Sequence, residues 1–402
     1  MILVLSLNYA TLLQEENLLD TLYSFQIYSA TSQLPEDWDC LSVDNIFLSK
    51  AYLSVLESSA PENMSCYYIA LFENERLAGI ALSQFIDLMQ LASFGDRDQC
   101  IKTSIRNFIF KRFSSNVLFV GNNMLTGQNA YAFSKDLPIK TALKTISKAA
   151  KSLQVLLDSQ GKKIHLISFK DFSETEIKWF ALPEYKKHYV FTTQPNMLFS
   201  IPEQWSSEQD YVDALNKKYR DQYKRARKKI VGLEKRKMTL EDIIAFEDVI
   251  YDLYFHVAKN APFNTFFLTK NHFRIFKEKL KDSFLFYGYF ENEKLIGFNT
   301  LIKNGATLDT YFLGYNEMVQ KEKMLYLNML YDMIGYAVEK QFKSIVFGRT
   351  ALEIKSSVGA KPIKMYGLME HRNGFINANM PKIFPYLEPE MNWQERNPFK
   401  NS

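Results

Sequence analysis

The feature that most constrains this chain of 402 residues is a short sequence that occurs twice. Residues 67–82 and 284–301 each contain Phe-Glu-Asn-Glu, then a basic residue, then Leu-x-Gly, all set between two apolar runs. A polar turn between two β-prone runs predicts an antiparallel hairpin. The sequence therefore predicts two equivalent hairpins, one in each half of the chain.

The segments that follow each hairpin repeat as well. In both halves an apolar strand that ends in glycine is followed by a helix, whose apolar residues return every three or four positions, and then by another apolar strand. A helix that connects two strands running the same way makes a right-handed crossover, so each half should be a mixed sheet covered by helices. The expected segments are 116–121, 139–157 and 164–169 in the first half, and 307–314, 324–340 and 344–348 in the second.

Length and composition are those of a globular chain with two cores. Domains usually hold about 100 to 200 residues, so we expect an N-terminal domain at 1–195 and a C-terminal domain at 196–402. The three cysteines have no disulfide or zinc spacing, which favours a reducing compartment. No run of about 18 apolar residues is present, and residues 1–7 are expected to form a buried strand. These features favour a cytoplasmic protein, with peripheral contact at the inner face of the membrane left open.

A basic segment separates the two repeats. Residues 211–237 have aromatic and apolar residues at four-residue steps, which predicts an amphipathic basic helix. Its cations form either a solvated face or a surface for an anionic partner, such as the phosphates of CoA, tRNA or lipid headgroups. A net charge of +4 gives no indication of DNA binding. The expected anion-binding residues are Lys217, Lys218, Arg220, Lys224, Arg225 and Lys228.

The segment 211–362 resembles the Fem-type group of the GNAT superfamily, which includes the FemAB-like proteins. The resemblance rests on the basic helix, the hairpin, the strand that ends at Gly314, and a glycine-containing segment at 348–355 with a Glu-x-Lys core. It implies the α/β (α+β) class, with tandem GNAT-like domains that are each a mixed, splayed sheet flanked by helices. The first half matches only in outline, so its domain is expected to be degenerate and the active site to lie in the second half.

One departure from the GNAT pattern concerns the donor. Acetyl-CoA-dependent members hold the pyrophosphate in a glycine-rich loop at a helix N-terminus, whereas the corresponding residues 319–323 contain no glycine. Fem-type enzymes that use aminoacyl-tRNA also lack a standard loop. The resemblance therefore leaves acyl-CoA, an acyl-carrier-protein thioester and aminoacyl-tRNA open as donor substrates. We expect no tightly bound cofactor, and the five histidines show no metal-binding spacing.

Two carboxylates are candidates for the catalytic base. Acyl transfer to an amine needs a proton acceptor near the attacking nitrogen. Glu353 follows a strand whose C-terminal end is where α/β sheets place ligands, but it is otherwise a surface carboxylate that pairs with Lys355 or Lys361. Asp309 lies inside the strand at 307–314, where a carboxylate either faces solvent or is kept for function.

Further residues are expected around these carboxylates. Tyr311 and Tyr315 could protonate a leaving thiolate or ribose oxygen, although strand tyrosines mostly pack. His256 and Asn260 share one helix face, where they serve either the acceptor pocket or the structure alone. A glycine at the end of a strand lets a ligand approach the backbone. The expected substrate-binding residues are Arg349, Lys355, Gly314, Tyr315, Gly348, His256 and Asn260.

We expect four side chains to converge on one pocket that adjoins the basic helix: Glu353, Lys355, Arg349 and Tyr311. The leading functional hypothesis is N-acyl or aminoacyl transfer to an amine of a cell-envelope precursor, either peptidoglycan or an amino lipid. The alternatives are N-acylation of a long-chain lipid base from an acyl thioester, and a non-catalytic binding protein that retains the fold. A fold by itself does not decide among these reactions. The sequence leaves the oligomeric state open.

Overall fold

The computed structural model describes residues 22–88, 115–261, 264–387 and 393–400. The strand expected at residues 1–7 lies outside these ranges. The first half is built from the following elements: β1 (Tyr23–Tyr28), α2 (Lys50–Ser59), β2 (Met64–Glu73), β3 (Arg76–Asp87), β4 (Asn116–Val120), β5 (Tyr131–Phe133), α4 (Ile139–Ser159), β6 (Leu166–Phe172) and β7 (Tyr189–Ser200).

The second half begins with five helices and one short strand, and then repeats the order of hairpin, strand, helix and strand. Its elements are α5 (Glu208–Ala214), α6 (Lys217–Lys229), β8 (Glu234–Lys237), α7 (Leu240–Ala245), α8 (Glu247–Lys259), α9 (His272–Leu280), β9 (Phe284–Glu291), β10 (Lys294–Asn304), β11 (Thr307–Tyr315), α10 (Glu317–Lys323), α11 (Leu325–Glu339), β12 (Ser344–Gly348), α12 (Leu352–Ser357), β13 (Lys361–His371), α13 (Gly374–Ala378) and α14 (Met380–Leu387).

The predicted hairpins are confirmed as β2–β3 and β9–β10. Both turn residues have positive φ in each hairpin, 46° and 67° at Asn74 and Glu75, and 50° and 61° at Asn292 and Glu293. This is the backbone of a two-residue turn that matches the twist of the strands it joins. In both hairpins the strand pairing shifts register within the Leu-x-Gly sequence, so this sequence forms a bulge at the same position in each. The repeated sequence is thus a repeated structure.

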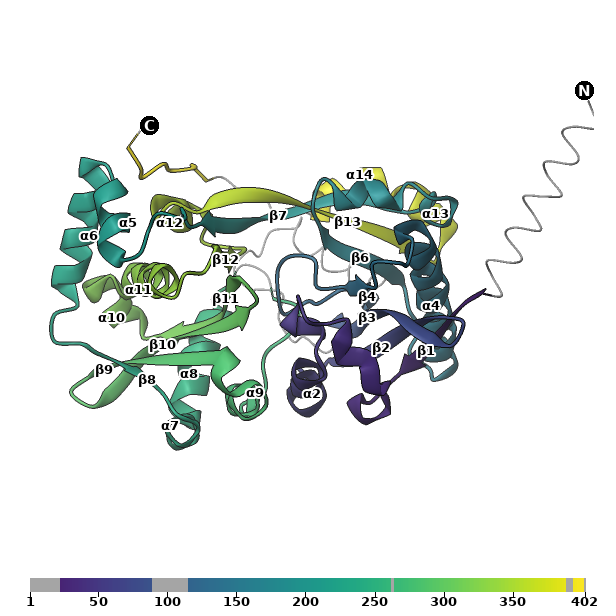
Figure 1. Cartoon of the computed structure of the whole chain (residues 1–402), viewed down its shortest axis with the longest axis horizontal. Coiled ribbons are helices and arrows are strands. Elements are labelled where there is room, and N and C mark those ends of the chain that lie inside the picture. Colours follow the sequence, from purple (N-terminus) through teal and green to yellow (C-terminus); the bar gives the residue numbers. More distant parts are fainter. Residues whose placement is uncertain (1–21, 89–114, 262–263, 388–392, 401–402) are drawn as a thin grey trace, which may run out of the picture.

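The strands form one continuous sheet in which two chain segments are exchanged between the halves (Figure 1). The strand order is β1-β2-β3-β4-β6-β13-β7-β12-β11-β10-β9-β8, with β5 paired to β3. β4 runs parallel to β6, and β11 runs parallel to β12, which is the crossover predicted in each half. The late strand β13 pairs with β6, while β7 pairs with β12. The boundary expected at 195/196 falls inside β7.

Apolar residues cover both faces of this sheet. Neighbouring residues of a strand point to opposite faces, and Leu301 and Ile302 of β10 belong to different cores. One core contains α2, α8 and α9, so it joins the two halves, a second contains α11, and a third contains α4. Among the described helices, none is long and apolar enough to cross a membrane.

The basic segment at 211–237 is not one helix, which corrects the sequence prediction. α5 ends at Ala214, and Leu215 forms a β-bridge with Phe399. Asn216 then caps α6 by accepting a hydrogen bond from the backbone N–H of Tyr219. The last basic residues of the segment form the short strand β8, which pairs with β9. The periodic pattern missed this break because a cap and a bridge depend on local polar contacts rather than on apolar spacing.

Candidate active site between two splayed strands

The parallel strands β11 and β12 separate beyond their first residues. Thr307–Asp309 pair with Ser344–Val346, after which β11 continues to Tyr315 without β12 as its neighbour. At the end of β12, Gly348 has a φ of +70°, and an added Cβ would meet only Thr126 Oγ1 at 3.6 Å. The open space therefore lies at the carboxyl ends of two parallel strands, where α/β sheets place ligands.

A cavity of about 750 Å³ occupies this fork. Its wall includes Tyr254 of α8 together with Leu330 and Met333 of α11, which belong to the cores on the two opposite faces of the sheet. The cavity thus reaches both faces through the gap between β11 and β12. Met124, Leu125 and Thr126 of the first half complete the wall, although the sequence placed the site in the second half alone.

Asp309 lies where the two strands separate. The residue is 4% exposed and lines the cavity. Its Oδ2 atom is buried and has no hydrogen-bond partner among the described residues. Burial raises the pKa of Asp309 to about 7, although a hydrogen bond from Asn304 acts in the opposite direction. A carboxyl group with this pKa can accept a proton from a substrate near neutral pH.

Tyr311 also lines the cavity, but its hydroxyl group is engaged elsewhere. The Tyr311 hydroxyl lies 3.0 Å from Nε2 of His272, and Nδ1 of the same ring lies 3.0 Å from the carbonyl oxygen of Ser59. A carbonyl oxygen can only accept, so Nδ1 carries the proton and Nε2 accepts one from Tyr311. Burial lowers the pKa of His272 to about 4, which keeps the ring neutral. This arrangement does not support Tyr311 as a proton donor to a leaving group.

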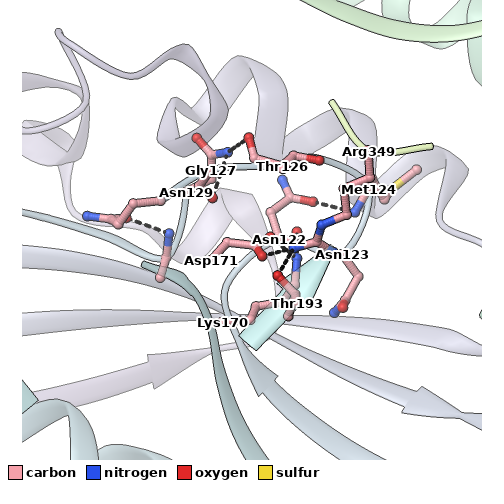
Figure 2. Close-up of polar contacts among 12 residues, drawn as sticks. Asn122, Asn123, Met124, Thr126, Gly127, Asn129, Lys170, Asp171, Thr193 and Arg349 are labelled. Carbon is pink, nitrogen blue, oxygen red and sulfur yellow. Dashed lines mark hydrogen bonds and ion pairs between the residues drawn. The ribbon is translucent and has the colours of Figure 1, made fainter. Parts of the chain in front are cut away.

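Arg349 connects the end of β12 with the first half (Figure 2). It donates to Oδ1 of Asp171, and to Oγ1 of Thr193 at 3.2 Å. The other carboxylate oxygen of Asp171 lies 2.5 Å from Nζ of Lys170, which also donates to the carbonyl oxygen of Asn122. Asp171 and Lys170 are both buried. Burial lowers the pKa of Arg349 to about 10, and it lowers the pKa of Lys170 well below its ordinary value.

Lys355 is a second cation in the wall of the cavity. It is 4% exposed, and its Nζ donates to the carbonyl oxygen of Arg349 at 2.6 Å and to that of Gly348 at 3.4 Å. Burial lowers the pKa of Lys355 to about 7. The backbone that it holds is strained, because Thr350 and Ala351 both have positive φ. Strain of this kind persists only where surrounding contacts impose it and is common at functional sites.

Comparisons with known proteins agree with this geometry. No protein-family model matches the sequence, and no curated protein matches it. The structure is similar to the crystal structure of FemX, with a TM-score of 0.50 and 11% identity over 85% of this chain and 96% of that one. The chain has the tandem GNAT fold of the Fem type.

Two other structures are similar to a lesser degree. A tandem GNAT protein from the clavulanic acid biosynthesis pathway has a TM-score of 0.48 and 8% identity, over 87% of this chain and 99% of that one. L-PGS from Bacillus licheniformis has a TM-score of 0.45 and 11% identity, over 84% of this chain and 96% of that one. At these identities the comparisons concern the fold alone.

Within the tandem GNAT fold, Glu353 is not where the sequence predicted. Its side chain is 50% exposed and forms an ion pair with Arg396. It does not contribute to the cavity wall, which corrects the prediction that it converges there with Arg349, Lys355 and Tyr311. The reason is that α12 begins at Leu352 and buries Leu352, Lys355 and Ser356, so that Glu353 lies on its outer face.

The remaining predicted residues divide between the cavity and the core. Tyr315, His256 and Asn260 line the cavity, and His256 faces Glu317 with 3.4 Å between Nε2 and a carboxylate oxygen. Gly314 does not serve ligand access, because an added Cβ would lie 2.6 Å from the backbone of α8. It allows α8 to pack closely on β11.

The predicted anion-binding residues lie on α6, apart from the cavity. Arg220 is half-buried and donates to the carbonyl oxygen of Leu215, and the other five are exposed. No residue of α6 contributes to the described cavity wall. α6 instead packs on α11, where Arg227 pairs with Asp332. The basic face therefore does not adjoin the cavity in the way the sequence predicted.

Proposed function

We propose that this protein is an acyl- or aminoacyltransferase that joins an acyl group to an amine inside the cavity between β11 and β12. The observation that most directly supports this proposal is the position of Asp309. Its buried carboxyl group, with a pKa raised to about 7, lies at the point where two parallel strands separate. A cavity that reaches both faces of a sheet allows a donor and an acceptor to approach the same point from opposite sides. Such positioning supplies much of the catalysis in acyl transfer.

The chemistry follows from the groups present. The amine nitrogen attacks the carbonyl carbon of the donor, so that a C–N bond forms and the bond from that carbon to sulfur or to the ribose oxygen breaks. Ionised Asp309 accepts the proton that the nitrogen loses, and the leaving thiolate or alkoxide takes a proton from solvent. No covalent intermediate with the enzyme is required.

Several features bear on the identity of the donor. In the GNAT pattern a glycine-rich loop that holds the pyrophosphate of CoA precedes the helix that corresponds to α11. Here the helix α10 occupies that place, so the usual CoA-binding loop is missing. The basic face of α6 supports an anionic donor such as aminoacyl-tRNA, or contact with anionic lipid headgroups. In the leading version of the proposal, the acceptor is an amine of a cell-envelope precursor.

One observation favours a second version, in which a lipid base is N-acylated from an acyl thioester. The cavity wall that α11 contributes consists of Tyr326, Leu330 and Met333, without a charged residue. An apolar wall suits an acyl chain better than it suits a sugar or a peptide.

A donor screen tests the proposal. The full chain is incubated with acyl-CoA, acyl-carrier-protein thioesters or aminoacyl-tRNA and a panel of amine acceptors, and products are identified by mass spectrometry. We expect an N-acylated product that disappears with Asp309→Asn and persists with Glu353→Gln. Products formed equally by Asp309→Asn would remove the proposed base. The absence of product from every donor would favour the non-catalytic binding protein.

A further inference from the structure

The cluster around Asp171 contains two basic side chains and one carboxylate. Arg349 and Lys170 both pair with the same carboxylate, and Asp171 and Lys170 are buried. The Nε atom of Arg349 is buried and has no hydrogen-bond partner among the described residues. Of the members of this cluster, Arg349 is the one that reaches the cavity wall. A basic side chain that shares its carboxylate with Lys170, and whose Nε–H has no acceptor among the described residues, therefore lies next to the cavity.

Lys355 is a second basic side chain in the same cavity wall. It bonds to the carbonyl oxygens of Gly348 and Arg349, which carry no charge. Burial lowers its pKa, and Lys355 forms no ion pair with a carboxylate in the described part of the chain. Nζ has three protons to donate, and an anion in the cavity can accept one that the two carbonyl oxygens leave free.

The carboxylates of the cavity wall do not balance these cations. Glu317 is already paired with Lys321 at 2.7 Å and with His256. Burial is the main cause of the raised pKa of Asp309, and no cation contributes to it. Buried charges without partners are costly, so an uncompensated cation at a cavity wall indicates that a ligand supplies the missing negative charge.

We propose that Arg349 and Lys355 form a subsite for an anionic group of the substrate, either a carboxylate or a phosphate, at the end of β12. The inference rests on the proposed function, because it assigns a substrate class to the same cavity. The subsite lies at the fork itself, which places the anion near the reacting groups. A charged group at this position selects acidic acceptors or acyl groups over neutral ones, because a neutral analogue leaves the cations unpaired.

Binding of matched small molecules tests the subsite without any turnover. The probes are N-acetylglycine, its neutral analogue N-acetylglycinamide, and inorganic phosphate, each at constant ionic strength, with the shift in Tm of the full chain as readout. We expect at least one of the two anions to raise Tm and the amide to leave it unchanged. A response to N-acetylglycine assigns a carboxylate, and a response to phosphate alone assigns a phosphate. Equal effects of acid and amide, or no effect of either anion, would overturn the proposal.

Variants locate the binding. We expect Lys355→Gln and Arg349→Gln each to weaken anion binding at least tenfold, whereas Arg396→Gln, which removes a surface arginine near α12, should leave it unchanged. Arg349→Gln also removes a contact between the halves, so Lys355→Gln decides the outcome if Arg349→Gln does not fold. Anion binding that persists in Lys355→Gln contradicts the subsite.

Calorimetry gives a readout that a purely structural role would not change. A bound anion raises the pKa of Lys355 from about 7, so binding near pH 7 should take up about half a proton. Titrations in two buffers of different ionisation enthalpy measure this uptake, and Lys355→Gln should reduce it to the part that Asp309, in the same cavity and with a pKa of about 7, contributes. Wild-type binding without proton uptake contradicts the role of Lys355. Anion binding with no product in the donor screen would refute the proposed function and leave the subsite standing.

Discussion

Two polar side chains in the cavity wall have different surroundings, and their chemistry differs for that reason. Asp309 has a free oxygen and a pKa raised to about 7 by burial. Tyr311 also lines the cavity, but its hydroxyl group donates a hydrogen bond to Nε2 of His272, and Nδ1 of that ring donates to the carbonyl oxygen of Ser59. The first is available for proton transfer with a substrate, and the second holds α2, α9 and β11 together.

Replacing Asp309 should remove the proton acceptor and leave the shape of the site intact. We expect Asp309→Asn to lower kcat/KM by about 10²- to 10⁴-fold. In the wild type, kcat/KM should fall as the pH drops below about 7, because only the ionised carboxylate accepts a proton and burial raises its pKa to about 7. Rates measured from about pH 5.5 to 8.5 in both proteins check this. Glu353→Gln is the control and should retain its rate, and a flat wild-type profile would count against Asp309.

Replacing Tyr311 should affect stability more than catalysis. Tyr311→Phe leaves the buried Nε2 of His272 without a donor, at a cost of about 1–3 kcal/mol in the free energy of unfolding. Urea unfolding measures this cost. Tyr336→Phe is the control and should cost less, because no buried ring nitrogen depends on that hydroxyl. Turnover should change less than about tenfold, and a loss comparable to that of Asp309→Asn would restore Tyr311 as an acid.

At the scale of elements, α6 shows how one helix can be basic and still well packed. Its inner side is fixed by Ala226 and by Arg227, which pairs with Glu208 and Asp332. The outward cations have no ion pair within the described part of the chain. Packing thus fixes the helix, and the remaining charge is available for a partner.

Reversing the outer face of α6 should abolish binding to polyanions. We expect the triple change Lys218→Glu, Lys224→Glu and Arg225→Glu to reduce binding to tRNA or to anionic phospholipid vesicles at least tenfold, and wild-type binding to weaken with salt. Fluorescence anisotropy and vesicle sedimentation measure the two partners. The control makes the same charge change on other exposed lysines: Lys135, Lys140 and Lys151. Wild-type binding that is indifferent to salt or to the reversal would leave α6 as a solvated face.

At the scale of the whole molecule, the two halves are joined by more than a linker. The exchange of β7 and β13 places a strand of each half against the sheet of the other. The core that contains α2 also contains α8 and α9, and Arg349 pairs with Asp171 across the same boundary. The cavity depends on this union, because Thr126 of the first half forms part of its wall.

Neither half should fold alone. Residues 1–195 lack β13, and residues 196–402 lack most of β7, so each fragment would expose unpaired sheet edges and an incomplete core. We expect both fragments, expressed separately, to aggregate or to unfold without a cooperative transition. Circular dichroism during thermal unfolding checks this against the full chain. A cooperative transition in either fragment would show that the exchange is not required for stability.

The sequence by itself determined the parts that depend on local rules. A two-residue polar turn, an apolar strand and a helical period are all properties of short segments. The hairpins and the crossover in each half could therefore be predicted from the sequence. The sequence also predicted that Asp309 lies inside a strand, but it did not predict that the side chain is buried.

Only the tertiary structure decided which distant side chains meet. Arg349 and Asp171 are 178 positions apart, and Ser59 and His272 are 213 apart. Their contacts depend on the strand exchange and on the packing of α2 against α9, which no local pattern encodes. Glu353 was misplaced for the same reason, because the face of α12 that turns inward is fixed by its neighbours. The sequence thus determined the elements, and their packing determined which residues form the site.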